Sequence, residues 1–162
     1  DTELTGHMKL RLWAAAAEAD DMDLFVAIQK IDRNGEHVGF HYYASFDTGP
    51  VALGWLRASH RELDAERSTP EQPVHTHRRE DRLKPGEFVP MEIEIWASST
   101  LFRTGERLRV LIKGSDVYPY PNRAPGLPLA LHEETRNRGA HRVRTGGSYD
   151  SHLLVPVIGP KR

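Results

Sequence analysis

Residues 8–14, Met-Lys-Leu-Arg-Leu-Trp-Ala, carry an apolar side chain at every second position. Successive side chains of a β-strand point to opposite faces of its sheet, so a period of two predicts a strand with one buried face. The same alternation recurs over residues 24–29, 91–96, 108–113 and 153–157. Several short strands with turn residues between them predict an all-β chain folded as an antiparallel β-sandwich.

The segments between these strands show how they connect. Residues 32–35, Asp-Arg-Asn-Gly, predict a hairpin, because Asn and Gly both tolerate positive φ. Residues 14–18, four alanines and a glutamate, have helical propensity. The aspartates within 20–23 would oppose the helix dipole at a C-terminus, so we expect residues 17–23 to connect two strands.

The composition limits the kinds of protein that this chain can be. Its 162 residues suit one domain, so we expect residues 1–162 to form a single β-sandwich. Lys and Arg number 22 and Asp and Glu 23, a balance that argues against a nucleic-acid partner. No apolar run reaches the roughly 18 residues needed to span a bilayer, so we expect no membrane partner. Cysteine is absent, which excludes disulfides, thiolate metal sites and a cysteine nucleophile.

The two ends of the chain differ in charge. Residues 1–40 sum to −4 and residues 120–162 to +4, an asymmetry that suits docking to another protein surface. The chain begins Asp1-Thr2-Glu3, without the pattern of a signal peptide. We therefore expect a piece of a longer protein and favour a cytoplasmic location.

Two long irregular segments are predicted, over residues 57–87 and 114–128. Each contains several prolines, which interrupt regular structure. Loops of this length inside a compact domain are usually functional or form interfaces.

One segment resembles a catalytic motif. Residues 146–150, Gly-Gly-Ser-Tyr-Asp, begin like the G-x-S-x-G turn that presents a nucleophilic serine. Asp150 replaces the last glycine, and a strand follows where the motif requires a helix. We interpret the segment as a turn into the last strand, and we expect no catalytic residue in this chain.

Two groups of residues could hold a metal ion. His75 and His77 with Glu80 resemble half of a cupin metal site, for which His132 and Asn137 could supply the other half. The step from His77 to Glu80 is shorter than the cupin spacing, so histidines of a solvated loop are the preferred interpretation. A carboxylate group that could bind Ca²⁺ comprises Glu18, Asp20, Asp21 and Asp23. Its irregular spacing favours a solvated turn, and we expect neither a metal nor a cofactor.

Aromatic and basic residues suggest two kinds of ligand. The aromatic set, which could stack on sugar rings, comprises Trp13, Trp55, Trp96, Tyr42, Tyr43, Tyr118 and Tyr120. Packing in a second buried face, such as one covered by a partner domain, is the default interpretation for the tryptophans. The basic set, which could hold a phosphate or carboxylate, comprises Arg136, Arg138, Arg142, Arg144 and His141. Its lack of interleaved aromatic residues argues against nucleic acid.

Eight segments in a fixed order resemble one known family. They are Leu4-Thr5-Gly6, Asp21-Met22-Asp23-Leu24, Asp32-Arg33-Asn34-Gly35, residues 54–61 (Gly-Trp-Leu-Arg-Ala-Ser-His-Arg), Leu83-Lys84-Pro85-Gly86-Glu87, residues 102–109 (Phe-Arg-Thr-Gly-Glu-Arg-Leu-Arg), residues 115–122, and residues 151–157 (Ser-His-Leu-Leu-Val-Pro-Val). In this order the chain resembles the C-terminal domain of the X-Pro dipeptidyl-peptidase and cocaine-esterase-like hydrolases (the CocE/NonD family). Two departures are Glu106, where the family usually has His, and the residues after Asn122.

The resemblance implies a jelly-roll β-sandwich similar to galactose-binding modules. It also implies an accessory role, in which the domain packs against an upstream α/β-hydrolase domain of the same polypeptide and helps to wall its cleft. The Ser-Asp-His triad of the family lies in that upstream domain. The parent would be a serine hydrolase acting on esters, peptides or amides through an acyl-serine intermediate.

Three further expectations follow from these interpretations. A free-standing carbohydrate-binding module is the main alternative, and a cupin-like metal protein a lesser one. The family has a strand before the segment that matches Leu4-Thr5-Gly6. If that strand belongs to the sandwich, the strand around Met8 would have an exposed edge, and copies of the chain would pair there.

Overall fold

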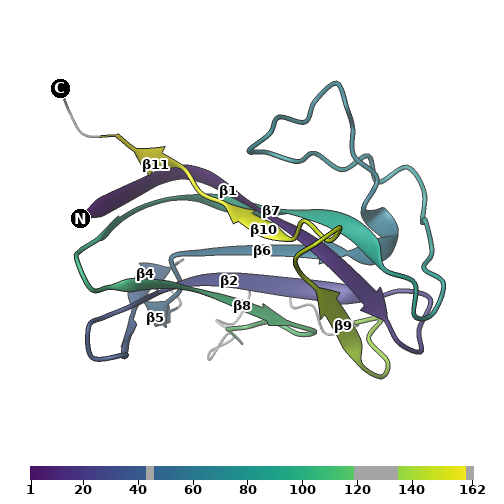
Figure 1. Ribbon diagram of the computed structural model, residues 1–162, viewed down its shortest axis with the longest axis horizontal. Helices are drawn as coiled ribbons and strands as arrows, with labels where there is room; N and C mark the ends of the chain where they lie inside the picture. The colour runs from purple at the N-terminus through teal and green to yellow at the C-terminus, as the bar shows by residue number, and fades with distance from the viewer. Residues whose placement is uncertain (43–45, 119–134, 160–162) are drawn as a thin grey trace, which may run out of the picture.

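The computed structural model describes residues 1–42, 46–118 and 135–159 of the chain (Figure 1). Its strands are β1 (Thr2–Ala16), β2 (Asp23–Ile31), β3 (His37–Val38), β4 (Phe40–Tyr42), β5 (Phe46–Gly49), β6 (Ala52–Arg57), β7 (Val89–Phe102), β8 (Arg107–Lys113), β9 (His141–Arg144), β10 (His152–Leu154) and β11 (Val157–Ile158). A single 3₁₀ turn, η1, covers Ala58–His60 among the described residues. No helix within the described ranges is long and apolar enough to cross a membrane.

The strands form two main antiparallel sheets that face each other (Figure 1). In the first sheet, β1 pairs with β7 along one edge and with β11, β10 and β9 in turn along the other. In the second sheet, β2 lies between β6 and β8 and also pairs with β3. A separate hairpin joins β4 to β5. The predicted antiparallel β-sandwich is confirmed, whereas its jelly-roll topology stays a prediction.

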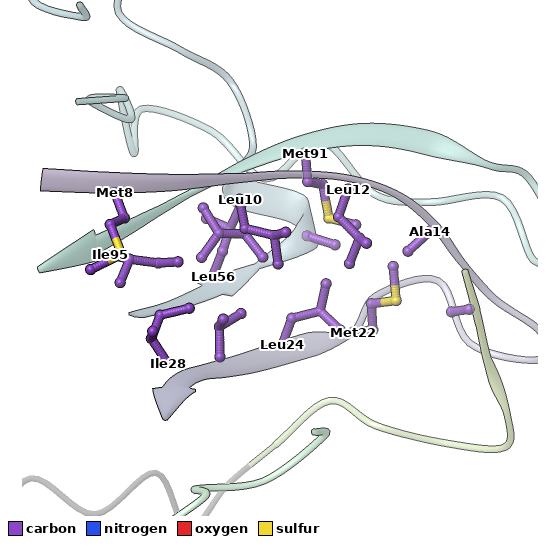
Figure 2. Close-up of a cluster of buried hydrophobic side chains, with 14 of the residues drawn as sticks. Met8, Leu10, Leu12, Ala14, Met22, Leu24, Ile28, Leu56, Met91 and Ile95 are labelled. Atoms are coloured by element: carbon purple, nitrogen blue, oxygen red, sulfur yellow. The ribbon is translucent and has the colours of Figure 1, made fainter. Parts of the chain in front are cut away.

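The core fills the space between the two sheets (Figure 2). Met8, Leu10, Leu12 and Ala14 point from β1 toward the second sheet, and each is at most 5% exposed. The apolar side chains of the second sheet that face them come from β2 and β6 and include Leu24, Ile28 and Leu56. Met91 and Ile95 of β7, the neighbour of β1 in the first sheet, line the same core. The apolar positions that alternate in the sequence of residues 8–14 are therefore the positions of β1 that are buried in the core.

A β-bulge changes the alternation within β7. Met91, Ile93 and Ile95 are buried, but beyond Trp96 the buried positions become Thr100 and Phe102. The register with β1 shifts at the same place, between the pairs Gly6–Ser98 and Met8–Ile95. The extra residue reverses which positions of β7 face the core, and it leaves the neighbours Trp96 and Ala97 both exposed.

The sheets approach each other most closely where β6 meets β7. A Cβ placed on Gly54 of β6 would overlap the carbonyl oxygen of Glu94 in β7. It would also lie 3.1 Å from Ile95 Cγ1. Only a residue without a side chain permits this backbone approach.

The predicted connections are largely confirmed. Asp32 accepts hydrogen bonds from the backbone N–H groups of Asn34 and Glu36 in the hairpin between β2 and β3. Residues 17–22 connect β1 to β2, and most of 58–88 is irregular. Much of the predicted loop 114–128 lies outside the described residues.

Two expectations about the strands are wrong in detail. The last strand is divided into β10 and β11 around Pro156, which has no N–H for a ladder hydrogen bond. The strand around Met8 is not an edge, because β7 covers one side of β1 while β10, β11 and the Thr5 N–H bond to Pro156 cover the other. The C-terminal strands take the edge that the prediction left open.

Candidate functional site

The candidate site is a groove of about 800 Å³ beside the crossing of β6 and β7. Trp55 of β6 and Trp96 of β7 form one wall, with ring centroids 5.1 Å apart and planes inclined by 60°. Glu94 of β7 and three histidines add polar groups to the lining. The sequence analysis treated the tryptophans and the histidines as separate candidates, and the fold brings them together.

The three histidines converge from two parts of the loop between β6 and β7. His60 ends η1, and His75 and His77 follow about fifteen residues later. The Nδ1 atoms of His60 and His77 are 3.2 Å apart, so one ring donates a hydrogen bond to the other. His77 has a φ of 49°, a left-handed conformation that is uncommon outside glycine. His60 could not be identified as a site residue from the sequence, because nothing in the residues around it indicates that it lies next to His77.

His75 is the most enclosed of the three. Its Nε2 atom is buried and has no hydrogen-bond partner among the described residues. Burial lowers the pKa of His75, and the neighbouring His77 adds to the shift because two positive rings would repel each other. His75 is therefore neutral around pH 7, and the groove holds an imidazole rather than an imidazolium at this point.

A buried aspartate holds the loop that carries these histidines. Asp21 is 1% exposed and accepts hydrogen bonds from Ser59 N at 2.9 Å and Ser59 Oγ at 2.8 Å. It also accepts a bond from the Met22 N–H at 3.0 Å. A buried carboxylate needs such partners to offset its lost hydration. Asp21, one of the four candidate Ca²⁺ ligands of the acidic group, is thus a structural acceptor and not part of a solvated turn.

A second anchor joins β2 to the segment before β9. Asp23 forms an ion pair with Arg57 at 2.8 Å, and its Oδ2 accepts a bond from the Arg136 N–H at 2.6 Å. The side chain of Asn137 completes the link, accepting from Asp23 N at 2.8 Å and donating to the carbonyls of Asp23 and Gly114. Asn137 therefore ties the residues just before β9 to the start of β2 and to the residue after β8, a role its sequence position did not reveal.

The candidate metal sites are not assembled by the described residues. No group of three or more His, Asp or Glu side chains within the described ranges has a metal-binding geometry. Glu80 forms an ion pair with Arg82 and does not join His75 and His77, while His132 lies outside the described residues. In the acidic group, Glu18 lies against Gly139 and Asp20 is 3.8 Å from Arg82.

The motif-like turn at 146–150 is an exposed turn that leads to β10, as predicted. Gly146 and Gly147 both have positive φ, and the Tyr149 N–H bonds back to the Gly146 carbonyl. Ser148 is exposed at the tip. A strand–turn–strand context does not form the elbow of a serine nucleophile.

An aromatic and ionic cluster lies on the outer face of the first sheet, next to that turn. Asp150 accepts hydrogen bonds from Trp13 Nε1 at 2.7 Å and from Arg11 Nε at 2.9 Å, and these bonds lower the pKa of Asp150. Arg144 lies 4.3 Å from the ring centre of Phe88 and 4.9 Å from that of Tyr149. Two members of the predicted sets, Trp13 and Arg144, therefore stabilise the surface of the sheet. Tyr43 and Tyr120 lie outside the described residues, and no contacts are described for the Tyr42 side chain.

Comparison with known proteins places this geometry in a family. Residues 1–154 match the family described as the X-Pro dipeptidyl-peptidase C-terminal non-catalytic domain. The chain is 29% identical over 165 aligned residues to proteins of Mycobacterium bovis and Mycobacterium tuberculosis whose names ascribe serine esterase activity to them. The alignment covers 98% of this chain but 22% of either relative.

Solved structures agree with the family match. Two crystal structures of a CocE/NonD family hydrolase from Staphylococcus aureus superpose on the chain with TM-scores of 0.91 and 0.92. Their sequences are 49% and 48% identical to this one, and the match covers 97% and 98% of this chain. In each case the chain spans 28% of the hydrolase. The resemblance read from eight ordered segments is confirmed: the chain belongs to the family of C-terminal non-catalytic domains of X-Pro dipeptidyl-peptidases and CocE/NonD hydrolases.

Proposed function

We propose that residues 1–162 form the C-terminal accessory domain of a longer serine hydrolase. The domain packs against the α/β-hydrolase domain of the same polypeptide and helps to shape its cleft. The parent enzyme cleaves acyl esters or X-Pro peptides through an acyl-serine intermediate, with the catalytic serine and its histidine base outside this chain.

The family match over residues 1–154 is the observation that carries this proposal. The relatives named as serine esterases and the CocE/NonD hydrolase are about four times longer than the part that this chain matches. The fold supports an independent domain, because the two ends of the chain pair in one sheet, with Glu3 opposite Ile158. A domain whose termini meet can be attached to another domain without disturbing its core.

The length of the native protein tests the proposal. An antibody against this domain, used on an extract of the source organism, should detect a polypeptide several times longer than 162 residues. The coding sequence upstream should contain a G-x-S-x-G elbow. A native product of the same length as this chain would contradict the proposal.

A second candidate function follows from the groove. Trp55 and Trp96 are 40% and 38% exposed, and Glu94 and the neutral His75 could exchange hydrogen bonds with hydroxyl groups. Aromatic rings beside such groups suit the apolar face and polar rim of a sugar. Binding to a glycan array that is lost in the Trp96→Ala variant, while the melting temperature is kept, would favour a carbohydrate-binding module.

A further inference from the structure

The sandwich is closed along one side and more open along the other, where β8 and β9 approach each other at one end: a Cβ placed on Gly114, just after β8, would lie 3.4 Å from His141 Cε1. On the closed side, β6 and β7 touch at Gly54 and Glu94. On the opposite side, β8 is the last strand of the second sheet and β9, β10 and β11 are the last strands of the first, within the described residues. No described strand pairs with their outer edges.

Apolar side chains face inward along this open side. Ile112 lies opposite Val26 in β2, and Val143 lies opposite Ala14 in β1, and both partners are completely buried core residues. Cross-strand partners point to the same face of a sheet, so Ile112 and Val143 point toward the core. They are nevertheless 38% and 46% exposed. We use the name open side for the apolar residues along these outer strands: Val110, Ile112, Val143, Leu153, Val155 and Val157.

This exposure differs from that of scattered surface residues. Val110, Leu153 and Val155 pack against the buried core from the same two edges, so the open side continues the core to the surface. Val157, at its end, is 58% exposed although its partner Leu4 is 5% exposed. Exposed apolar side chains that continue a core to the surface mark a face that another protein can cover.

The strands beside the open side carry positive charge and no acids. In β8 the cations are Arg107, Arg109 and Lys113, and in β9 they are Arg142 and Arg144. Among the described residues, none of these five cations forms an ion pair with a carboxylate. The β8 cations lie on the outer face of one sheet and the β9 cations on the outer face of the other, so they border the open side from both directions.

This charge pattern decides between two occupants. In a symmetric pairing of two copies, the same patch meets itself, and Arg107, Arg109 and Lys113 of one copy would lie near those of the other. Cationic edge strands oppose such pairing. A different surface with an apolar centre and acidic borders would instead match both the open side and its cations.

We propose that the open side is the surface by which this domain docks on the hydrolase portion of its own polypeptide, and that the docked surface is apolar at its centre and acidic at its border. This inference rests on the proposed accessory function. It deepens that function by naming the docking face, which lies opposite the Trp55–Trp96 groove. The groove then stays outside the docked interface.

Hydrogen–deuterium exchange compares the chain alone with the longer hydrolase polypeptide. Amides of β8, β9 and β10 should exchange at least about tenfold more slowly in the longer protein, which corresponds to about 1.4 kcal/mol of added protection. Amides of β3, on the other side of the sandwich, should exchange at similar rates in both.

The double variant Ile112→Glu/Val143→Glu tests the side chains directly. Both residues are only 38% and 46% exposed, so the chain alone should lose some stability but stay folded, which its melting curve checks. In the longer protein the variant should abolish the protection. Leu101→Glu is the matched control, because Leu101 is an apolar strand residue with 44% exposure that lies outside the open side.

Each other outcome overturns the inference in a distinct way. Protection confined to another face, with β8 and β9 unchanged, would refute the docking face and leave the accessory function standing. No protection anywhere on the domain would refute the accessory packing itself. A doubled mass of the chain in light scattering, reduced to the monomer mass by Ile112→Glu, would show that a second copy occupies the open side.

Discussion

Replacing Gly54 with alanine should destabilise the domain, because the two sheets meet at this residue. The added Cβ would overlap the Glu94 carbonyl oxygen and lie 3.1 Å from both the Glu94 carbonyl carbon and Ile95 Cγ1. The obstacle is mainly backbone in the centre of β7, so it cannot rotate away as a flexible side chain would. The two sheets must separate at the closed side.

The magnitude follows from two opposing effects. Overpacking a core by a methyl group costs about 1–3 kcal/mol, and a backbone obstacle places the cost at the upper end of that range. Alanine in place of glycine within a strand returns about 0.5–1 kcal/mol through the lower entropy of the unfolded chain. We therefore expect Gly54→Ala to lower the free energy of unfolding by about 2 kcal/mol, which lowers the melting temperature of a domain of this size by about 4–8 °C.

Urea denaturation followed by tryptophan fluorescence measures this change. Gly159→Ala is the matched control, because a Cβ at Gly159 has no atom within 4 Å and should leave the transition midpoint unchanged. A loss of less than about 0.5 kcal/mol in Gly54→Ala would refute the close approach of β6 and β7.

Three further changes test the anchors and the titrating groups. Asp21→Ala should cost about 2–4 kcal/mol in urea denaturation, because it leaves the buried Ser59 donors unsatisfied, while Asp20→Ala at the exposed neighbour should cost little. Asn137→Ala should raise amide exchange at Asp23 and at the start of β9 by at least about tenfold, and unchanged exchange would refute its bridging role. Burial lowers the pKa of His75 and of His141, so the unfolded chain binds protons first as the pH falls. Stability should thus decline as the pH drops below about 6.5, and a thermal midpoint that rises on acidification would contradict this expectation.

The strands around Met8 and Met91 could be predicted from sequence because each has one face in the core, and their periods match the buried positions. The strand around Leu24 was predicted with one buried face, but both faces of β2 are buried, since Phe25 and Ala27 are also at most 5% exposed. The bulge at Trp96 could not be predicted, because both registers of β7 present a plausible apolar stripe and the choice depends on β1 across the sheet. Similarly, the pairing of β1 with the C-terminal strands is a contact between opposite ends of the chain, which local patterns do not encode.

The site was less accessible to sequence reasoning than the fold. The exposed turn at Ser148 was predicted, because the elbow motif has a strict structural context that this sequence lacks. The acidic group was predicted as a solvated turn, but Asp21 is buried and organises Ser59 across the loop. A carboxylate that accepts hydrogen bonds from a residue far along the chain has no signature in the local sequence. Gly54, in contrast, could have been noticed, because an isolated glycine within a strand pattern indicates a close backbone approach.

Labelling with a fluorophosphonate probe locates the serine nucleophile, because this reagent modifies only activated serine nucleophiles. We expect that the purified chain stays unlabelled while the longer polypeptide that contains it acquires one adduct, located outside residues 1–162. An adduct on Ser148 of the chain alone, together with ester turnover lost in Ser148→Ala, would show that this domain is itself catalytic and would contradict the account.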